Sequence, residues 1–101
     1  MNILLICPLK ISCSTTVNSL KSEAKQWGVE LNIDTSSSTE AYNQMNNGYD
    51  LAIVSQALKY EYSLLEETAN KIGLPIGLIG AVEDTPIGSR RLLERVLRLY
   101  E

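Results

Sequence analysis

Short apolar segments alternate along this sequence with stretches of helical periodicity, and this order constrains the fold more than any other feature. Residues 2–6, apolar after Asn2, form a run typical of a strand buried on both faces of a sheet, and residues 50–54, apolar after Asp50, form a second. A third apolar segment occupies residues 76–79. Residues 29–33 alternate apolar and polar side chains, which favours an edge strand, and a polar loop is expected at residues 35–39. The sequence therefore predicts four strands.

Helical periodicity fills the intervals between these strands. Apolar residues recur every three or four positions over residues 17–27, and Gly28 then supplies a stop signal. The polar loop ahead of residues 40–46 supplies an N-cap for a short helix there. The clearest apolar stripe runs over residues 58–72, and a last one occupies residues 92–100. Each predicted strand is therefore followed by a predicted helix.

This βα alternation predicts parallel strands joined by right-handed helical crossovers. The predicted fold class is α/β: an open four-stranded parallel sheet of order 2-1-3-4, in a flavodoxin-like three-layer sandwich. A ferredoxin-like α+β domain fits less well because it needs neighbouring strands paired in sequence order. The 101 residues contain no linker and no repeat, so we predict one domain over residues 1–101.

Charge and composition exclude several classes of function. Nine basic and twelve acidic residues give a net charge of −3, which disfavours nucleic acid as a partner. The absence of histidine removes imidazole acid–base chemistry and imidazole metal ligands. No apolar run is long enough to insert into a membrane, and the first residues lack the features of a signal peptide. We therefore expect a cytoplasmic protein.

The two cysteines, Cys7 and Cys13, are expected to be free thiols. A chain without an export signal occupies a reducing compartment, where disulfides are rare. Two thiols without histidine are too few ligands for zinc, so no metal site is predicted. A redox pair of the two thiols is a weaker alternative because the sequence lacks the Cys-x-x-Cys spacing.

The position of Cys7 makes it a candidate nucleophile. Ligands of open parallel sheets bind beyond the carboxyl ends of the strands, where the strand order reverses, which here lies between the first and third strands. Cys7 directly follows the first strand, and the turn at residues 55–57 follows the third. The helix start after the Cys7 loop presents unpaired N–H groups, which favour a thiolate and bind phosphate oxygens. The alternative is a buried cysteine that only packs.

Four segments of the sequence together resemble one protein family. They are the apolar first strand ending in Cys7, the loop positions Ser12, Ser14 and Val17, the segment 50–56 with Gln56, and the entry 73–76 into the last strand. The loop positions fall in step with the pattern Cys-x-x-Gly-Met-Ser-Thr-Ser of that family, and the other segments resemble its third strand, its Gly-Pro-Gln turn and its Gly-Ile-Pro-Val motif. Over almost its whole length, the chain resembles the IIB component of the sugar phosphotransferase system, of the lactose/cellobiose (chitobiose) class.

The resemblance implies a phosphoryl carrier. Members of this family accept a phosphoryl group on the loop cysteine from a histidine of the IIA component. They pass it to a sugar, here expected to be a β-linked disaccharide such as cellobiose or lactose, bound by the membrane component IIC. Carried over, Cys7 is the phosphorylated nucleophile, and the scheme implies no metal and no cofactor. The backbone amides that bind the phosphoryl oxygens are then those of Leu9, Lys10, Ile11, Ser12, Cys13 and Ser14.

The same loop departs from the family pattern at three positions. Pro8 replaces a small residue and lacks an N–H donor, Lys10 replaces a glycine, and Cys13 replaces a threonine. Lys10 either pairs with the phosphoryl group or is a solvated lysine. These departures motivate an alternative function, a IIB-like binding or regulatory module that is not phosphorylated.

Two surface groups complete the candidates. A docking patch around the cysteine is the first, with core packing as the alternative; it comprises Leu9, Ile11, Leu58 and Tyr60. A basic set on the last helix is predicted to be a solvated face; it comprises Arg90, Arg91, Arg95 and Arg98.

Overall fold

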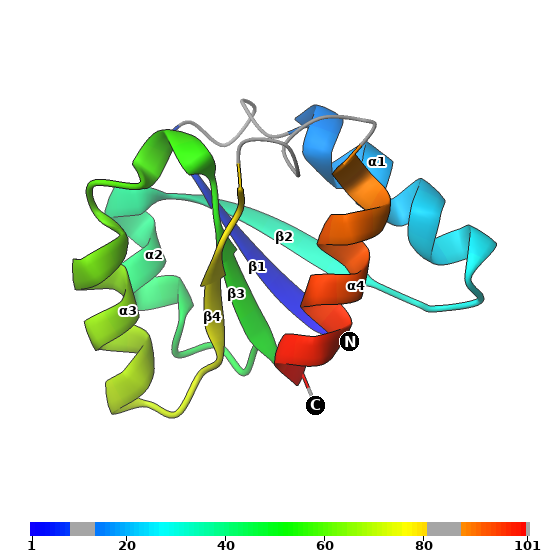
Figure 1. Ribbon diagram of the computed structural model, residues 1–101. Coiled ribbons are helices and arrows are strands. Elements are labelled where there is room, and N and C mark those ends of the chain that lie inside the picture. Colours follow the sequence, from blue (N-terminus) through cyan, green and yellow to red (C-terminus); the bar gives the residue numbers. More distant parts are fainter. Residues whose placement is uncertain (9–13, 81–87, 101) are drawn as a thin grey trace.

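The structure is a computed structural model that describes residues 1–8, 14–80 and 88–100 (Figure 1). Its strands are β1 (Asn2–Cys7), β2 (Asn32–Ser37), β3 (Leu51–Val54) and β4 (Ile76–Leu78). Its helices are α1 (Ser14–Gln26), α2 (Ser38–Gln44), α3 (Tyr62–Lys71) and α4 (Ser89–Tyr100), with a short 3₁₀ helix η1 (Gln56–Leu58).

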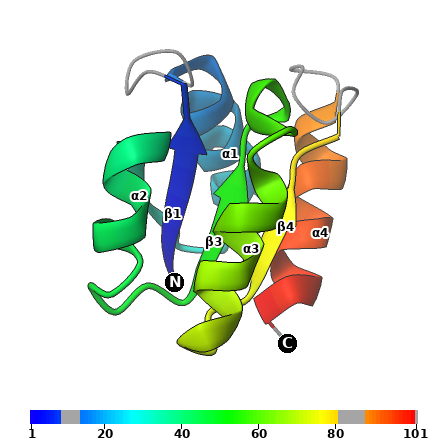
Figure 2. The same cartoon turned by 90° about the vertical axis from the view of Figure 1, so that its left-hand side faces the viewer.

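The strands form one parallel sheet of order β2-β1-β3-β4, which confirms the predicted α/β class and strand order. The strands β1 and β3 occupy the centre of the sheet, as Figure 2 shows. In the register of the sheet, Cys7 lies opposite Ser37 of β2, and Ile6 lies opposite Val54 of β3. Cys7 therefore extends one position beyond the last β1–β3 residue pair.

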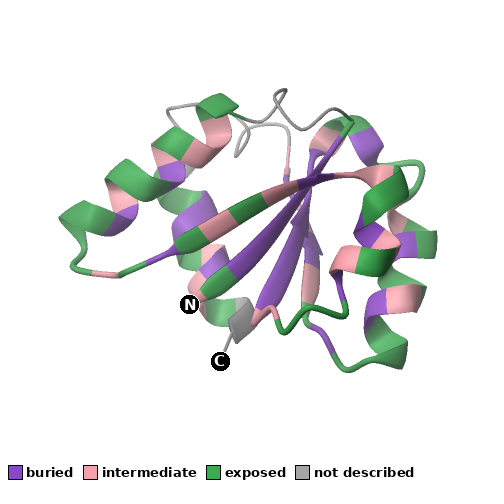
Figure 3. Ribbon diagram, turned by 180° about the vertical axis from the view of Figure 1, so that it is seen from behind, coloured by how far each residue is buried: buried purple, intermediate pink, exposed green. Residues whose placement is uncertain are grey.

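Helices cover both faces of the sheet, with α1 and α4 on one side and α2 and α3 on the other (Figure 1). Side chains of β1 alternate between the two faces. Ile3, Leu5 and Cys7 pack in the cluster with α1 and α4, whereas Leu4 and Ile6 pack in the cluster with α2 and α3. Figure 3 shows the central strands buried and β2 alternating between buried, intermediate and exposed positions. The continuous apolar run of β1 thus corresponds to burial on both faces.

The second strand was predicted too early in the chain. It was expected at residues 29–33, with a polar loop at residues 35–39, but β2 continues through the loop to Ser37. Parallel pairing with β1 extends β2, because backbone hydrogen bonds form whatever the polarity of the side chains. The N-cap of the next helix is confirmed: the Ser37 Oγ accepts a hydrogen bond from the backbone N–H of Glu40 at 3.3 Å.

The third helix is shorter than the stripe at residues 58–72 predicted. The first turn of that stripe is the separate element η1, and α3 begins at Tyr62. The apolar positions Leu58, Leu65 and Ala69 are buried as the stripe requires, but Ile72 lies after the helix and is exposed.

The end of the first helix also differs in one residue. Trp27 was placed on the buried stripe, but it follows α1 and is 39% exposed. Its indole N–H donates to Glu23 at 3.3 Å, and the guanidinium of Arg90 lies 5.9 Å from the ring centroid. The stop at Gly28 is confirmed: this glycine has φ 70°, a conformation that other residues resist, and Val29 N–H donates back to the Ala24 carbonyl at 2.8 Å.

Candidate functional site

The carboxyl ends of the central strands meet at one edge of the sheet, and Cys7 lies there as the last residue of β1. Figure 1 shows that the start of α1 and the element η1 lie at the same edge. Strand β1 lies between β2 and β3 in the sheet. The helices that follow β2 and β3, α2 and α3, cover one face of the sheet, whereas α1, which follows β1, covers the other. Cys7 therefore occupies the point of the sheet where ligands of this fold class bind.

Backbone hydrogen bonds fix the ends of the neighbouring strands around this point. The N–H of Ser55 donates to the carbonyl of Ile6 at 2.8 Å, and the N–H of Ile79 donates to the carbonyl of Val54 at 2.8 Å. The Ser55 Oγ, in a residue only 5% exposed, accepts from the N–H of Ala57 at 3.4 Å and caps η1. The hydrogen bond from Ser55, which follows β3, thus fixes the backbone of Ile6, the residue before Cys7.

The sulfur of Cys7 is bonded and buried, which corrects the prediction of free thiols. Cys7 is in a disulfide, no cysteine in the described residues is free, and the side chain has 0% exposure. Its Sγ lies 3.9 Å from the Leu5 carbonyl oxygen; in a disulfide this is a contact and not a donated hydrogen bond. The sequence contains one other cysteine, Cys13, which lies outside the described residues. The physical reason is that a reducing compartment is only a tendency of many proteins, whereas a disulfide depends on whether two cysteine sulfurs can meet in the folded chain.

Most of the predicted phosphate-binding loop lies outside the described residues, namely Leu9, Lys10, Ile11, Ser12 and Cys13. The described residues at its two ends are Pro8, which is exposed after β1, and Ser14, which is exposed as the first residue of α1. The chain therefore enters the loop from a buried strand end and leaves it at a helix start, where backbone N–H groups lack intrahelical acceptors. The binding role of the loop amides stays a prediction.

The residues of the predicted docking patch differ in exposure in the structure. Leu58 is 8% exposed and packs with α3, so the core interpretation is right for this residue. Tyr60 is 89% exposed, and the Nζ of the neighbouring Lys59 lies 5.2 Å from its ring centroid. Leu9 and Ile11 lie outside the described residues. An aromatic ring and a cation are thus exposed just after η1.

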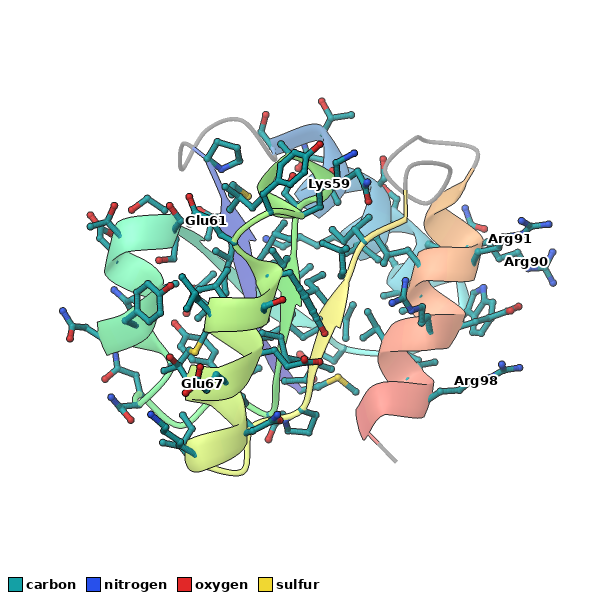
Figure 4. The ribbon with its side chains drawn as sticks, turned by 60° about the vertical axis from the view of Figure 1, so that its left-hand side comes forward. Lys59, Glu61, Glu67, Arg90, Arg91 and Arg98 are labelled. Atoms are coloured by element: carbon teal, nitrogen blue, oxygen red, sulfur yellow. The ribbon has the colours of Figure 1, made fainter. Side chains whose placement is uncertain are left out.

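The predicted solvated face on α4 is confirmed for three of its four arginines. Figure 4 shows Arg90, Arg91 and Arg98 projecting from α4 away from the sheet. Arg90 pairs with Glu94 at 3.9 Å with both side chains largely exposed, so the pair contributes little to stability. Arg95 was predicted on the same face but is partly buried, so the prediction is wrong for this residue.

Other features of the described chain lie apart from Cys7. One hollow, of about 490 Å³, lies at the far end of α1, between Lys21 and Leu31. Another, of about 360 Å³, lies at the opposite edge of the sheet between Tyr49 and Pro75. Within residues 1–8, 14–80 and 88–100, no three potential metal-ligating side chains of His, Cys, Asp or Glu come together. None of the described helices is both long enough and apolar enough to span a bilayer.

Comparison with known proteins identifies the family. Residues 2–86 match the family described as PTS system, Lactose/Cellobiose specific IIB subunit. The chain belongs to this IIB family. Membership confirms the resemblance in the sequence and gives the chain a phosphotransfer role in the sugar phosphotransferase system. No protein with a curated description matches the sequence.

Two solved structures share the IIB fold. The first is the lactose-specific IIB component domain of the phosphoenolpyruvate:carbohydrate phosphotransferase system from Streptococcus pneumoniae. It has a TM-score of 0.82 at 20% identity, covering 100% of this chain and 98% of that one. The second is the cellobiose-specific phosphotransferase IIB component protein from Borrelia burgdorferi. It has a TM-score of 0.79 at 22% identity, covering 99% of this chain and 91% of that one. At these identities the likeness establishes the fold.

The sequence did not predict two features at the edge of the sheet where β1 and β3 end. The first is the disulfide at Cys7, for which the only sequence signal was the second cysteine six positions later. The second is Ser55, which caps η1 and bonds the end of β1. A serine directly after a buried apolar strand was the signal that pointed to this cap.

Proposed function

We propose that this chain is a phosphoryl carrier that uses Cys7 as its acceptor. One observation carries the proposal: in a chain of the IIB family, Cys7 ends the central strand β1 at the switch point of the sheet. The donor is the phosphohistidine of a IIA component, and the final acceptor is a sugar bound by a membrane IIC component. The reaction takes place in the cytoplasm, where we expect the chain to work.

The chemistry is two successive phosphoryl transfers. In the first, the Cys7 thiolate attacks phosphorus, an S–P bond forms, and the P–N bond to the donor histidine breaks, leaving its electron pair on nitrogen. In the second, a sugar hydroxyl attacks phosphorus, the S–P bond breaks, and the hydroxyl proton is released. Neither step needs a metal or another cofactor, because phosphoryl transfer depends mainly on positioning and charge stabilisation.

The loop after Cys7 supplies the stabilisation in this proposal. Phosphoryl oxygens accept hydrogen bonds from backbone amides of residues 9–14, and the start of α1 adds the positive end of a helix dipole. Pro8 contributes no N–H. The side chain of Lys10 replaces this donor with a positive charge.

The sugar is proposed to be a β-linked disaccharide. The family description reads lactose/cellobiose specific, and the two similar structures are named lactose-specific and cellobiose-specific IIB proteins. The choice between these sugars belongs to the membrane component, because the carrier itself presents only a phosphoryl group.

Phosphoryl uptake by the reduced protein tests the proposal. The chain is treated with dithiothreitol and incubated with phosphorylated IIA components, and phosphocysteine is detected by mass spectrometry before it hydrolyses. Cys7→Ser abolishes the label while retaining the fold, checked by circular dichroism. Cys13→Ser makes the same atomic exchange at the other cysteine and keeps its backbone amide, so this variant still accepts label. Folded, reduced protein that takes no label from any IIA component favours the unphosphorylated binding module instead.

A further inference from the structure

The helices on the two sides of the sheet carry charge of opposite sign. On one side, α4 contains four arginines and one glutamate, and α1 contains Lys21 and Lys25 against Glu23. On the other side, α2 and α3 together contain three glutamates and one lysine. Figure 4 shows the labelled arginines pointing away from the sheet on the α4 side, with Glu67 on α3 across the sheet. A chain of net charge −3 therefore presents one basic side.

The basic face of α4 consists of Arg90, Arg91 and Arg98, whose side chains are exposed. Arg91 and Arg98 are seven residues apart, so they lie on the same side of the helix, about 10 Å from each other along its axis. Among the described residues, no acidic side chain forms an ion pair with either of them. Arg90, 72% exposed, lies 3.9 Å from Glu94, which is 46% exposed. Three exposed cations thus share this face with one anion.

The one tryptophan of the chain lies beside the basic face of α4. Trp27 is 39% exposed, and the guanidinium of Arg90 lies 5.9 Å from its ring centroid. An indole combines an apolar ring with a polar N–H, and such side chains favour the boundary between water and lipid headgroups. The cations of α4 therefore adjoin an aromatic ring suited to a bilayer surface.

We propose that the basic face of α4, together with Trp27, docks the chain on an anionic phospholipid bilayer without inserting into its apolar core. Anionic headgroups attract each nearby arginine, and a guanidinium pairs with two phosphate oxygens at once. An acidic protein surface would attract the same arginines. A bilayer is the occupant we assign because of Trp27 and because the proposed final acceptor is held in a membrane. The benefit for sugar transfer rests on the proposed function, whereas the lipid binding does not.

The acidic side of the chain does not cancel this attraction at physiological salt. The helices α2 and α3 lie across the sheet from α4, and even the shortest dimension of the chain is 19 Å. The Debye length is about 8 Å at ~0.15 M salt. A bilayer in contact with α4 is therefore screened from the glutamates of α2 and α3, and it responds mainly to the arginines.

Sedimentation with vesicles tests lipid binding without any phosphotransfer partner. The probes are vesicles of phosphatidylcholine alone and vesicles that also contain phosphatidylglycerol, at ~0.15 M salt. The wild type should sediment with the anionic vesicles only, and ~1 M salt, where the Debye length is about 3 Å, should release it. The fluorescence of Trp27 should shift to shorter wavelength on the anionic vesicles. No binding to the anionic vesicles, or equal binding to both kinds, overturns the proposal.

Matched charge variants test whether α4 is the surface that binds. Arg91→Gln combined with Arg98→Gln should lower binding about 25-fold, since each arginine near an anionic surface contributes about fivefold. Lys59→Gln combined with Lys71→Gln removes the same charge from exposed positions after η1 and in α3. This control should bind as the wild type does. Equal losses in the two folded double variants would show a response to net charge alone and overturn the proposal.

Sugar phosphorylation separates contact with lipid from contact with the membrane protein. The α4 double variant should accept from IIA as the wild type does. Its transfer to sugar should be slower than that of the wild type with IIC in anionic vesicles, and equal with IIC in neutral detergent. The same slowing in detergent would show that the arginines contact IIC itself, which overturns the lipid proposal. Reduced protein that accepts from no IIA component overturns the proposed function, whereas vesicle binding still decides the lipid surface.

Discussion

Leu20 is the larger of the two buried residues of helix α1, and shortening its side chain tests whether the position of this helix affects phosphoryl transfer. Leu20 is fully buried and, with Ala24, packs in the same cluster as Cys7. Leu20→Ala removes three carbons, about 2.4 kcal/mol at ~0.8 kcal/mol for each methylene. The unfilled cavity raises the cost to about 3 kcal/mol. A domain of this size is stable by about 5–15 kcal/mol, so the variant should stay folded at 25 °C.

Leu65→Ala is the matched control. Leu65 is also fully buried, but it anchors α3 with Ala69 in the cluster on the opposite face of the sheet. The same three carbons are lost, so the free energy of unfolding should fall by a similar amount, about 3 kcal/mol. For a domain of about 100 residues this lowers Tm by about 12 to 24 °C in both variants.

The assay compares unfolding in urea with phosphoryl uptake by reduced protein, measured well below the lower Tm. A helix N-terminus stabilises a nearby negative charge by about 0.3–1 kcal/mol, so loss of the α1 position should slow uptake in Leu20→Ala about two- to fivefold. Leu65→Ala should accept at nearly the wild-type rate. Equal slowing in both folded variants, or no slowing in Leu20→Ala despite its lower Tm, would refute the reasoning.

Four further predictions concern separate parts of the structure. In the native reduced protein, Cys7 should alkylate faster at neutral pH than a cysteine of pKa ~8.5; a rate profile against pH that matches the ordinary thiol contradicts this. Lys10→Ala should slow phosphoryl uptake, and Lys10→Gly should restore it only if loop shape matters more than charge; equal rates in all three proteins would show a solvated lysine. Ser37→Ala removes the cap of α2 and should lower the free energy of unfolding by about 1 kcal/mol in urea. Burial, followed by the hydrogen bond to Asp34 and its charge, raises the pKa of Tyr49 above 10.0. The neutral phenol therefore stabilises the fold fully below pH 10.0, and this contribution is lost as the pH rises through the folded pKa. In Tyr49→Phe, the urea concentration at half-unfolding should fall less steeply with rising alkaline pH than in the wild type. An unchanged dependence on pH would contradict the assignment.

The sequence predicts the sheet well where side chains on both faces of a strand are apolar. The runs at residues 2–6 and 50–54 correspond to β1 and β3, because a central parallel strand excludes water from both faces. The edge strand β2 was displaced because its polar residues carry no such signal, although Ser36 is fully buried within it. Backbone pairing with β1 determines where β2 ends, and a single-sequence pattern does not contain that pairing.

The sequence predicted where Cys7 lies in the fold, but it did not predict that the sulfur of Cys7 is in a disulfide. The end of an apolar strand followed by a helix placed Cys7 at the switch point, and the structure confirms this location. The disulfide escaped prediction because cysteine spacing and compartment describe tendencies of many proteins. Whether a given cysteine sulfur meets another is decided by the folded backbone, which spacing in the sequence does not describe.

Burial of Cys7 adds a condition of access to phosphoryl transfer. Its side chain packs in the cluster with Leu5 and Leu20 and has no exposed surface in the described state. A phosphohistidine approaches with the attacking sulfur and the leaving nitrogen roughly in line through phosphorus, so the sulfur needs an open side. The disulfide and the complete burial occur in the same state. Phosphoryl acceptance therefore has two requirements: the disulfide must be reduced to give a thiolate, and that thiolate must become accessible. Alkylation of Cys7 in the native reduced protein measures the second: a sulfur that stays unreactive until urea is added would show that reduction alone does not open the site.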